Sequence, residues 1–386
     1  MKLKQLSTIT SFTVLADGLD NPKGLTFAPD GSLYITETGT GGKGASVLSA
    51  SGQGNLYYGT SGAVIKIENG IIKRILTGLP SLAFPDGTGA AGAHDIKFDA
   101  SGKPYVLIGY AANPSARDTT LSDTDLGKVI APDFDTNSWT TVADISGYEL
   151  ANNPDGDEIV SNPLALLIDQ DNIAIVDAGA NDLLRVGTDG KHLKDIAVLP
   201  KLLLTNPVFP GSQSQVFDKG HVPPADAYRQ TPSQLPIQQV PTSVTKGPDG
   251  AYYISTFTGF PFPEGQAKVY RLDSDGQLTV YADGFTQLID LTFDEEGNLY
   301  VLQFANQSGW KGKFDGSLIK VSPDGTRTNL LSGHGLEAPS AMTIGSDGAF
   351  YILNRGGRPK QGQVIRIECS ESVSQPVSSP SLLIGC

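Results

Sequence analysis

Apolar and polar positions alternate along this chain in one pattern that occurs six times. Each copy combines a short apolar stretch, a turn of the Asp-Gly type and a strand in which apolar residues alternate with polar ones. Alternation with a period of two is typical of a β-strand, and an Asp-Gly pair supplies the positive φ angles of a tight hairpin turn. We therefore predict six β-hairpins, which begin near Asn21, Gly92, Asn162, Val240, Gln287 and Ala338.

A third apolar strand follows each hairpin, as in GAVIKIENG at 62–70. Five of the six copies continue through a second turn into a fourth strand, whereas the sixth runs into the Ser- and Pro-rich sequence SESVSQPVSSPS. The segment SFTVLADGL at 11–19 has the pattern of a fourth strand, but the three strands that should precede it are missing. We therefore expect this N-terminal strand to complete the last sheet.

The repeat predicts an all-β fold, a six-bladed β-propeller with four-stranded blades whose ring is closed by the N-terminal strand. Closing the ring removes the exposed sheet edges that would otherwise invite association. We expect a single propeller domain over residues 11–370 and a Ser/Pro-rich C-terminal tail over residues 371–386. The alternative is an open row of tandem hairpins, which would leave the first strand unpaired.

The two ends of the predicted propeller carry different connections. Tight Asp-Gly and Asn-Gly turns join the strands at one end, whereas the other end receives the long insertions. Elaborated loops on one end of a rigid scaffold are where binding and catalytic groups are usually found. We expect the functional site on this loop-bearing face, whose main insertions lie within residues 37–61, 110–126, 148–161 and 201–239.

The composition narrows the classes of function. The 386 residues include 45 Gly and 25 Pro with 18% charged residues, which fits short strands joined by many turns. The formal net charge of −13 argues against nucleic acid or anionic lipid as a partner. No apolar run approaches the roughly 18 residues of a membrane-spanning helix, so membrane insertion is not expected. The motifs of nucleotide-binding loops and of the GxSxG nucleophile are absent, so no nucleotide cofactor is expected.

The ends of the chain bear on its compartment. The first residues, MKLKQLSTITS, lack the apolar stretch of a signal peptide. The two cysteines, Cys369 and Cys386, lie in the last eighteen residues, where a disulfide would staple the tail and leave the core unchanged. Such a bond would be compatible with an oxidising compartment, but the two thiols do not establish one.

Two positions in each repeat, the start of the first strand and the end of the second, should project into the upper central channel. Most of these positions carry oxygen donors, and oxygen donors favour calcium or magnesium, while a lone histidine among them also admits manganese, iron or copper. The alternative is a hydrated polar channel without a metal ion. The predicted channel positions are Asn21, Lys23, Glu37, His94, Asp95, Asn162, Asp177, Thr242, Thr256, Asp290, Gln303, Ser340, Asn354 and Arg355.

Within this ring, His94, Asp95 and Glu37 are the candidate catalytic residues. A histidine beside a carboxylate serves as a general base or as a metal ligand, although it can equally be a structural residue that ties one blade to the next. The segment DNPKGL resembles the sugar-lactonase propellers, whose metal ring uses Glu, two Asn and Asp. That resemblance implies a divalent-cation site, with calcium as the favoured ion, on Glu37, Asn162, Asp177 and Asp290.

Aromatic residues concentrate in the insertions of the loop-bearing face. Flat rings favour aromatic ligands through stacking and edge contacts, although part of this set must pack the loops on themselves. We expect an aromatic small-molecule substrate, bound by Tyr110, Phe257, Phe260, Phe304, Trp310 and Arg355.

The opening repeat FTVLADGLDNPKGLTFAPDGSLYITETG, the six-fold pattern, the closing N-terminal strand and the Ser/Pro-rich end together resemble the cyanobacterial ScyD/ScyE-type propeller family. The resemblance covers about residues 11–370. It implies a late, periplasmic or exported step of scytonemin biosynthesis, in which an indole-phenol monomer is dimerised by oxidation. It also implies possible contact with other proteins of that pathway, and it transfers no residue role.

Three functions are consistent with the sequence. The first is a propeller enzyme that binds the aromatic monomer and promotes its oxidative coupling, with or without a metal ion. The second is a propeller that binds a ligand or partner without catalysis. The third is a metal-dependent hydrolase of the lactonase type. A fold of this kind supports all three, so the site must decide between them.

Overall fold

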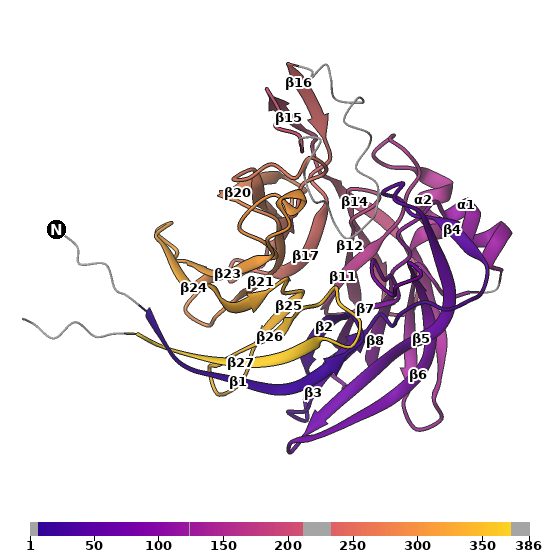
Figure 1. Ribbon diagram of the computed structural model, residues 1–386, viewed down its shortest axis with the longest axis horizontal. Helices are drawn as coiled ribbons and strands as arrows, with labels where there is room; N and C mark the ends of the chain where they lie inside the picture. The colour runs from indigo at the N-terminus through magenta and orange to yellow at the C-terminus, as the bar shows by residue number, and fades with distance from the viewer. Residues whose placement is uncertain (1–6, 123, 211–232, 372–386) are drawn as a thin grey trace, which may run out of the picture.

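The computed structural model describes residues 7–122, 124–210 and 233–371, and within them the predicted six-bladed β-propeller is confirmed. Figure 1 looks along the central channel, which the innermost strand of each blade lines. Each innermost strand contacts the innermost strands of both neighbouring blades, so the ring is continuous. These strands are β2 (Pro22–Phe27), β7 (Ala93–Phe98), β11 (Pro163–Asp169), β17 (Pro241–Lys246), β21 (Leu288–Phe293) and β25 (Ala341–Ile344).

Each blade is an antiparallel sheet that extends outward from its innermost strand. The second strands are β3 (Leu33–Glu37), β8 (Pro104–Ile108), β12 (Asn172–Asp177), β18 (Tyr252–Thr256), β22 (Leu299–Gln303) and β26 (Phe350–Asn354). The third strands are β5 (Asn55–Glu68), β9 (Lys128–Asp133), β13 (Asp182–Gly187), β19 (Ala267–Leu272), β23 (Asp315–Val321) and β27 (Gly362–Glu371). The outer strands are β6 (Ile71–Ala83), β10 (Ser138–Asp144), β14 (Lys194–Val198), β20 (Leu278–Phe285), β24 (Arg327–Glu337) and β1 (Ser7–Leu19).

The N-terminal strand closes the ring as the sequence pattern predicts. β1 pairs antiparallel with β27, with Phe12 opposite Ile367 and Leu19 opposite Gly362, and Figure 1 shows the two strands side by side. The Ser340 hydroxyl also donates to the Pro22 carbonyl at 2.7 Å, which joins the innermost strands of the last and first blades. Since the first strand is paired, an open row of hairpins is excluded.

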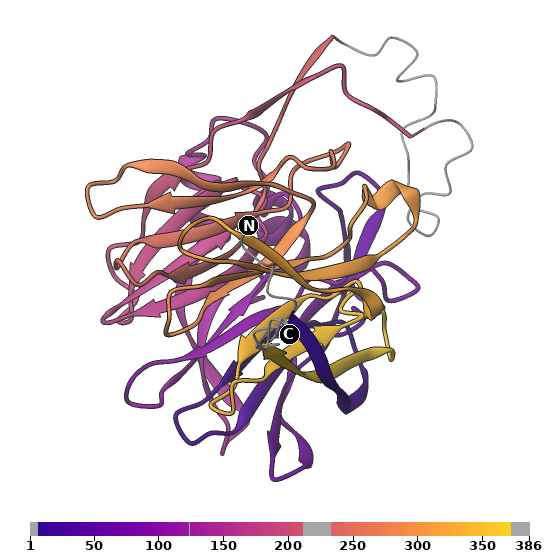
Figure 2. The same cartoon turned by 90° about the vertical axis from the view of Figure 1, so that its left-hand side faces the viewer.

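The insertions add small elements at the end of the propeller where second and fourth strands finish. They are β4 (Ser46–Leu48), α1 (Pro114–Ala116), the π-helical turn η1 (Arg117–Leu121), α2 (Ile145–Asn152), the hairpin of β15 (Leu202–Thr205) and β16 (Gln234–Ile237), and the 3-10 turn η4 (Gly309–Lys311). Figure 2 shows the β15–β16 hairpin reaching away from the blades. The predicted tail beyond residue 371 and the side chains of Cys369 and Cys386 lie outside the described part.

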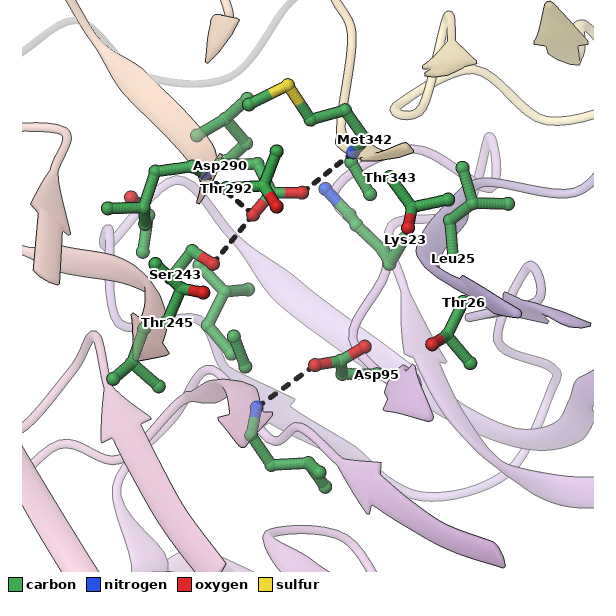
Figure 3. Close-up of a pocket in the computed structure, with 18 of the residues that line it drawn as sticks. Lys23, Leu25, Thr26, Asp95, Ser243, Thr245, Asp290, Thr292, Met342 and Thr343 are labelled. Atoms are coloured by element: carbon green, nitrogen blue, oxygen red, sulfur yellow. Dashed lines mark hydrogen bonds between the residues drawn. The ribbon is translucent and has the colours of Figure 1, made fainter. Parts of the chain in front are cut away.

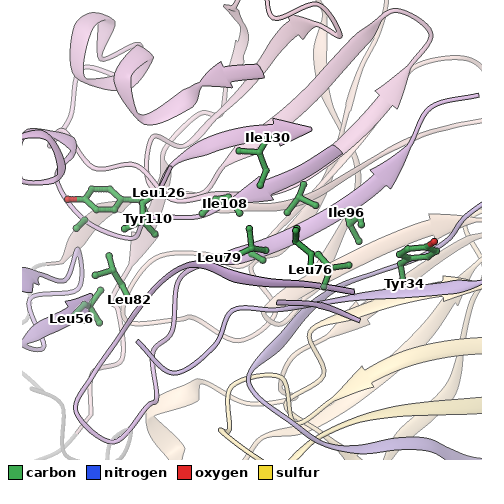
Figure 4. Packing of buried hydrophobic residues seen from close by; sticks show 14 of the residues in the cluster. Tyr34, Leu56, Leu76, Leu79, Leu82, Ile96, Ile108, Tyr110, Leu126 and Ile130 are labelled. Carbon is green, nitrogen blue, oxygen red and sulfur yellow. The ribbon is translucent and has the colours of Figure 1, made fainter. Parts of the chain in front are cut away.

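The hydrophobic core is divided among the spaces between adjacent blades. Between the first two blades, Leu76, Leu79, Ile96 and Ile108 are fully buried together (Figure 4). Five further buried clusters fill the other interfaces. Each blade therefore gains its apolar burial from both neighbours, which couples the stability of the blades around the ring. Among the described helices, none has the length and apolar character to cross a membrane.

Candidate functional site

The innermost strands enclose a cavity of about 120 Å³ in the central channel. This volume accommodates several water molecules or a small ligand. Hydroxyl groups line much of it, and Figure 3 shows Lys23, Asp95 and Asp290 among the surrounding side chains. The threonine and serine residues that line the cavity are Thr26, Thr242, Ser243, Thr245, Thr292, Ser340 and Thr343.

Asp95 lines the cavity and connects the second blade to the third. Its Oδ1 accepts hydrogen bonds from the Ile96 amide at 2.8 Å and from Lys97 Nζ at 2.6 Å. Its Oδ2 accepts from the Leu166 amide on β11 at 3.0 Å. Both oxygens are therefore engaged within the protein.

Asp290 has a corresponding place on β21. Its Oδ1 accepts from Ser243 Oγ at 2.7 Å and from the Leu291 amide at 2.8 Å, and its Oδ2 accepts from the Met342 amide at 2.7 Å. These bonds reach the blade on each side, so Asp290 links three blades. Burial raises the pKa of Asp290 to about 6, and its hydrogen bonds oppose that rise.

His94 is buried at the cavity and is held neutral. Its Nδ1 lies 2.8 Å from the Pro163 carbonyl, an acceptor, so Nδ1 carries the proton and Nε2 is left as the acceptor. Burial, assisted by the charge of Lys23, lowers the pKa of His94 to about 4 against the opposing effect of the Pro163 bond. A Cβ at Gly109 would stand 1.9 Å from the imidazole Cε1, so the ring packs where only glycine leaves space. This bonding corresponds to the structural role considered for His94.

The structure does not assemble the predicted catalytic group of His94, Asp95 and Glu37. The first two line the cavity, but the Asp95 carboxylate pairs with Lys97 rather than with His94. Glu37 is 1% exposed and forms a two-point ion pair with Arg74, at 2.7 Å from Nε to Oε2 and 2.9 Å from Nη2 to Oε1. The sequence pattern could not show this pairing, because Arg74 lies two strands further along the same blade.

Two of the predicted metal ligands, Asp177 and Asp290, are likewise engaged by groups of the protein. Asp177 is fully buried, with Oδ2 accepting from Ser161 Oγ at 2.5 Å and Oδ1 from the amides of Asn162 at 2.6 Å and Gly179 at 2.9 Å. Within the described residues, no group of three or more His, Cys, Asp or Glu side chains is arranged to hold a metal ion. Of the predicted set, the carboxylates of Glu37, Asp177 and Asp290 bind an arginine, nearby amides or hydroxyls instead. The side-chain oxygen of Asn162 is buried and has no hydrogen-bond partner among the described residues.

The predicted aromatic residues of blades four and five do come together on the loop-bearing face. The rings of Phe257 and Phe304 have centroids 5.6 Å apart, and each also contacts a further ring at 5.7 to 5.8 Å. The Trp310 indole donates to the Pro261 carbonyl at 2.9 Å, which ties the loop after β22 to the loop after β18. The rings of blades four and five in mutual contact, here called the aromatic cluster, are Phe257, Phe260, Phe262, Phe304 and Phe314. Phe209, from the insertion before the fourth blade, also contacts Phe260, with ring centroids 5.9 Å apart.

The remaining two predicted substrate-binding residues, Tyr110 and Arg355, lie in different environments. Tyr110 is fully buried in the hydrophobic cluster between the first two blades, where its hydroxyl donates to the Asn113 carbonyl at 3.0 Å (Figure 4). It therefore packs the core and does not present its ring at the surface. Arg355 lies near the backbone of the aromatic cluster. Its amide donates to the Glu337 carbonyl, and the amide of Ala338, which follows Glu337 in the chain, donates to the Phe314 carbonyl at 2.7 Å. Its guanidinium pairs with Glu337 at 3.2 Å.

Lys23 stands out at the cavity because its ammonium group has no hydrogen bond or ion pair with any of the residues that the structure describes. Burial lowers the pKa of Lys23. The repeat placed this residue at the channel, but the partners of a lysine depend on which neighbouring carboxylates are already engaged. Both Asp95 and Asp290 are engaged, and this follows from inter-blade contacts that the sequence pattern does not encode.

Comparisons with known proteins define the fold. A scan against protein-family models finds no match, and a search of the curated proteins finds none either. Among solved structures, a gluconolactonase from Xanthomonas campestris superposes with a TM-score of 0.52 at 10% identity, covering 96% of each chain. A glucose dehydrogenase has a TM-score of 0.51 at 14% identity over 93% of this chain and 100% of its own. The calcium-binding protein regucalcin from Agrobacterium tumefaciens has a TM-score of 0.50 at 12% identity over 95% of each chain. At these identities the likeness establishes a shared propeller fold.

Proposed function

We propose that this propeller binds an aromatic indole-phenol monomer at the aromatic cluster and promotes its oxidative dimerisation in a late, exported step of a scytonemin-type pathway. The observation that carries the proposal is the meeting of five phenylalanine rings from two blades on the loop-bearing face. Aromatic pairs in edge contact form walls that accept a further flat ring.

The exposure of the rings supports a binding surface. Core aromatics of the same blades, such as Phe285, are 2% exposed, whereas every ring of the aromatic cluster is only half-buried. The loops that carry them are fixed to one another by the Trp310 bond and by the ion pair of Lys311 with Glu264 at 2.6 Å. A pre-formed and partly exposed set of rings is the usual composition of a site for a small apolar ligand.

The chemistry assigned to the site is positioning. Coupling two monomers forms one carbon–carbon bond and removes one hydrogen from each, and dioxygen accepts the two electrons and two protons to give hydrogen peroxide. Holding two flat monomers side by side converts their encounter into a reaction between bound neighbours, which is a large kinetic advantage. A divalent cation, if bound, would assist the oxidation, and no described residue is assigned that step.

A second function, ligand binding without catalysis, is favoured by one observation. His94 and Asp95 are engaged in bonds between the second and third blades, and Glu37 is engaged by Arg74 within the first blade, so the residues expected to perform proton transfer have structural partners. Under this alternative the aromatic cluster would carry or organise the monomer for another pathway protein.

The test combines binding and turnover. Purified full-length protein is titrated with the monomer, and dimer formation under air is followed by chromatography. Phe257→Ala and Phe304→Ala are expected to weaken binding at least tenfold, because each removes a central ring of the cluster. Phe12→Ala, which removes a partly exposed ring on β1, is the matched control and should leave binding unchanged.

The outcomes separate the two functions. Binding together with faster dimer formation, both reduced in the two cluster variants, supports the coupling function. Binding without any acceleration over the protein-free reaction assigns the non-catalytic function. Failure of the wild-type chain to bind the monomer overturns both.

A further inference from the structure

Two buried carboxylates beside the third blade have no hydrogen bond of standard geometry within the part of the chain that the structure describes. Glu149 on α2 and Asp182 on β13 are each 1% exposed, and all four of their carboxylate oxygens lack a partner of hydrogen-bonding geometry among the described residues. A buried polar group without a partner costs several kcal/mol, and an isolated buried charge costs more. Such an arrangement calls for a compensating group.

The sequence of α2 directs Glu149 toward the blade. Asp144 caps the helix by accepting from the Gly147 amide at 2.8 Å, which sets where the helix begins. Ser146 in the first turn lies 2.6 Å, oxygen to oxygen, from Ser161, whose hydroxyl donates to Asp177 at 2.5 Å. The face of α2 that carries Ser146 therefore faces the end of β12. Glu149 lies three residues further along and shares that face.

The β12–β13 hairpin directs Asp182 toward the helix. Asp177 and Asp182 are opposite each other in the antiparallel register, so their side chains lie on the same face of the sheet. That face meets α2, because Asp177 reaches the Ser146–Ser161 pair. A second contact, from the Asp195 amide to the Tyr148 hydroxyl at 3.1 Å, fixes α2 against β14 as well. Glu149 and Asp182 thus face one buried region from two sides.

No described basic side chain forms a hydrogen bond with either carboxylate. Burial and the charges of Asp177 and Asp155 raise the pKa of Glu149 to about 7, and the Val160 amide offsets only part of this rise. Burial and four neighbouring carboxylates raise the pKa of Asp182. Two described basic groups near α2 are paired with other carboxylates, Arg117 with Asp144 and Asp118, and Lys201 with Asp157.

We propose that Glu149 and Asp182 bind a divalent cation, and that the ion is calcium. A third oxygen supports this assignment, because Asn153 Oδ1 is also buried without a partner among the described residues. Asn153 caps the C-terminus of α2, where its amide donates to the Glu149 carbonyl at 2.9 Å. Calcium accepts carboxylate and amide oxygens together with main-chain carbonyls and water in a flexible geometry. With two acidic ligands and an amide, the site does not require a group of three acidic side chains, which the described residues do not provide.

The site is separate from the central cavity and does not depend on the proposed function. Its ligands come from α2 and β13, so a bound ion would connect the insertion between the second and third blades to the body of the third blade. Calcium would then stabilise one part of the loop-bearing face by joining two elements whose carboxylates otherwise repel each other.

The test uses the full-length chain after removal of metal ions with a chelator. CaCl₂ is titrated in a calorimeter, and thermal unfolding is recorded with CaCl₂, with MgCl₂ and with chelator. The wild-type chain is expected to bind one calcium ion and to unfold at a higher temperature with CaCl₂ than with MgCl₂. Glu149→Gln and Asp182→Asn should each weaken calcium binding at least tenfold. Asp189→Asn changes an exposed turn carboxylate of the same blade and should bind calcium as the wild type does.

A stability measurement in chelator keeps the test decisive if a variant misfolds. Both amide variants should be at least as stable as the wild type without calcium, because each removes an uncompensated buried charge and keeps the shape of the side chain. Absence of saturable calcium binding by the wild type at millimolar concentration would overturn the proposal. So would calcium binding of unchanged affinity in both folded variants, since the ion would then lie elsewhere.

Discussion

At the scale of single residues, hydrogen-bond partners decide which polar side chains are available for chemistry. The sequence predicts Glu37, Asp95 and Asp290 as candidate functional residues, because carboxylates at strand ends near a channel are suited to binding. In the structure each is engaged, by Arg74, by Lys97 and by the Ser243 hydroxyl respectively. Lys23, Glu149 and Asp182, by contrast, are among the described residues whose charged groups lack a hydrogen-bond partner.

His94 permits a prediction about pH. In the folded protein the pKa of His94 is lowered to about 4 from an ordinary value of 6.5. Between these values the unfolded chain binds a proton and the folded chain does not, so the free energy of unfolding decreases as the pH falls from about 6.5 to about 4. His94→Asn keeps a donor for the Pro163 carbonyl but cannot titrate, and it is expected to lose this part of the pH dependence.

Urea unfolding at several pH values between 4 and 8 measures the effect as a difference between the two proteins. Groups such as Asp290, whose raised pKa acts in the opposite direction, are common to both and cancel. His192→Asn, on an exposed turn, should keep the wild-type profile. Parallel profiles for the wild type and His94→Asn would show that His94 does take up a proton in the folded state.

At the scale of elements, α2 illustrates how an insertion is fixed to a rigid blade. Asp144 caps the helix through the Gly147 amide and also binds the buried Arg117 through two bonds, of 2.7 and 2.9 Å. One carboxylate therefore sets the start of the helix and neutralises a guanidinium that is 4% exposed. The orientation of Glu149 depends on this arrangement.

We predict that Asp144→Ala lowers the free energy of unfolding by about 2 kcal/mol, because it removes a helix cap and leaves Arg117 with Asp118 as its remaining carboxylate partner. This value allows for the partial exposure of Asp144, which weakens the ion pair. Asp144→Asn keeps a capping oxygen and should lose less than Asp144→Ala. Chemical unfolding followed by circular dichroism measures both, and equal stability of wild type and Asp144→Ala would contradict the assignment.

At the scale of the whole molecule, the pairing of β1 with β27 joins the two ends of the chain in one sheet. Without β1 the last blade would expose the edge of β27. The hydrophobic cluster between the last and first blades would also lose the residues that β1 contributes, Ala16 and Leu19. Ring closure is thus expected to make unfolding of the six blades a coupled process.

We predict that deletion of residues 1–19 abolishes the single cooperative unfolding transition or makes the protein aggregate. Deletion of residues 1–6 alone, which precede β1, is the control and should leave the transition in place. Scanning calorimetry and light scattering measure the two effects. Addition of a peptide with the sequence of residues 7–19 should restore part of the stability of the longer deletion, and an unaltered transition in that deletion would show that closure is dispensable.

Four features of the fold can be predicted from the amino-acid sequence alone: the hairpins, the number of blades, the closing strand and the loop-bearing end. These features follow from local information, since alternation of apolar and polar residues indicates a strand and an Asp-Gly pair indicates a tight turn. The last repeat lacks a fourth strand, and the N-terminal strand, which belongs to no other repeat, supplies it. The meeting of Phe257 with Phe304 was also foreseeable, because both follow second strands of adjacent blades.

The tertiary structure alone decided the partner of each polar side chain. Tyr110 packs in the core rather than at a ligand surface, Glu37 pairs with Arg74, and Glu149 and Asp182 are buried without a hydrogen-bond partner among the described residues. Hydrogen bonds and ion pairs depend on distances of a few tenths of an ångström between segments far apart in the chain. A repeat pattern predicts the strand position of a side chain but not its hydrogen-bond or ion-pair partner. The chemistry of the site therefore depends on the tertiary structure.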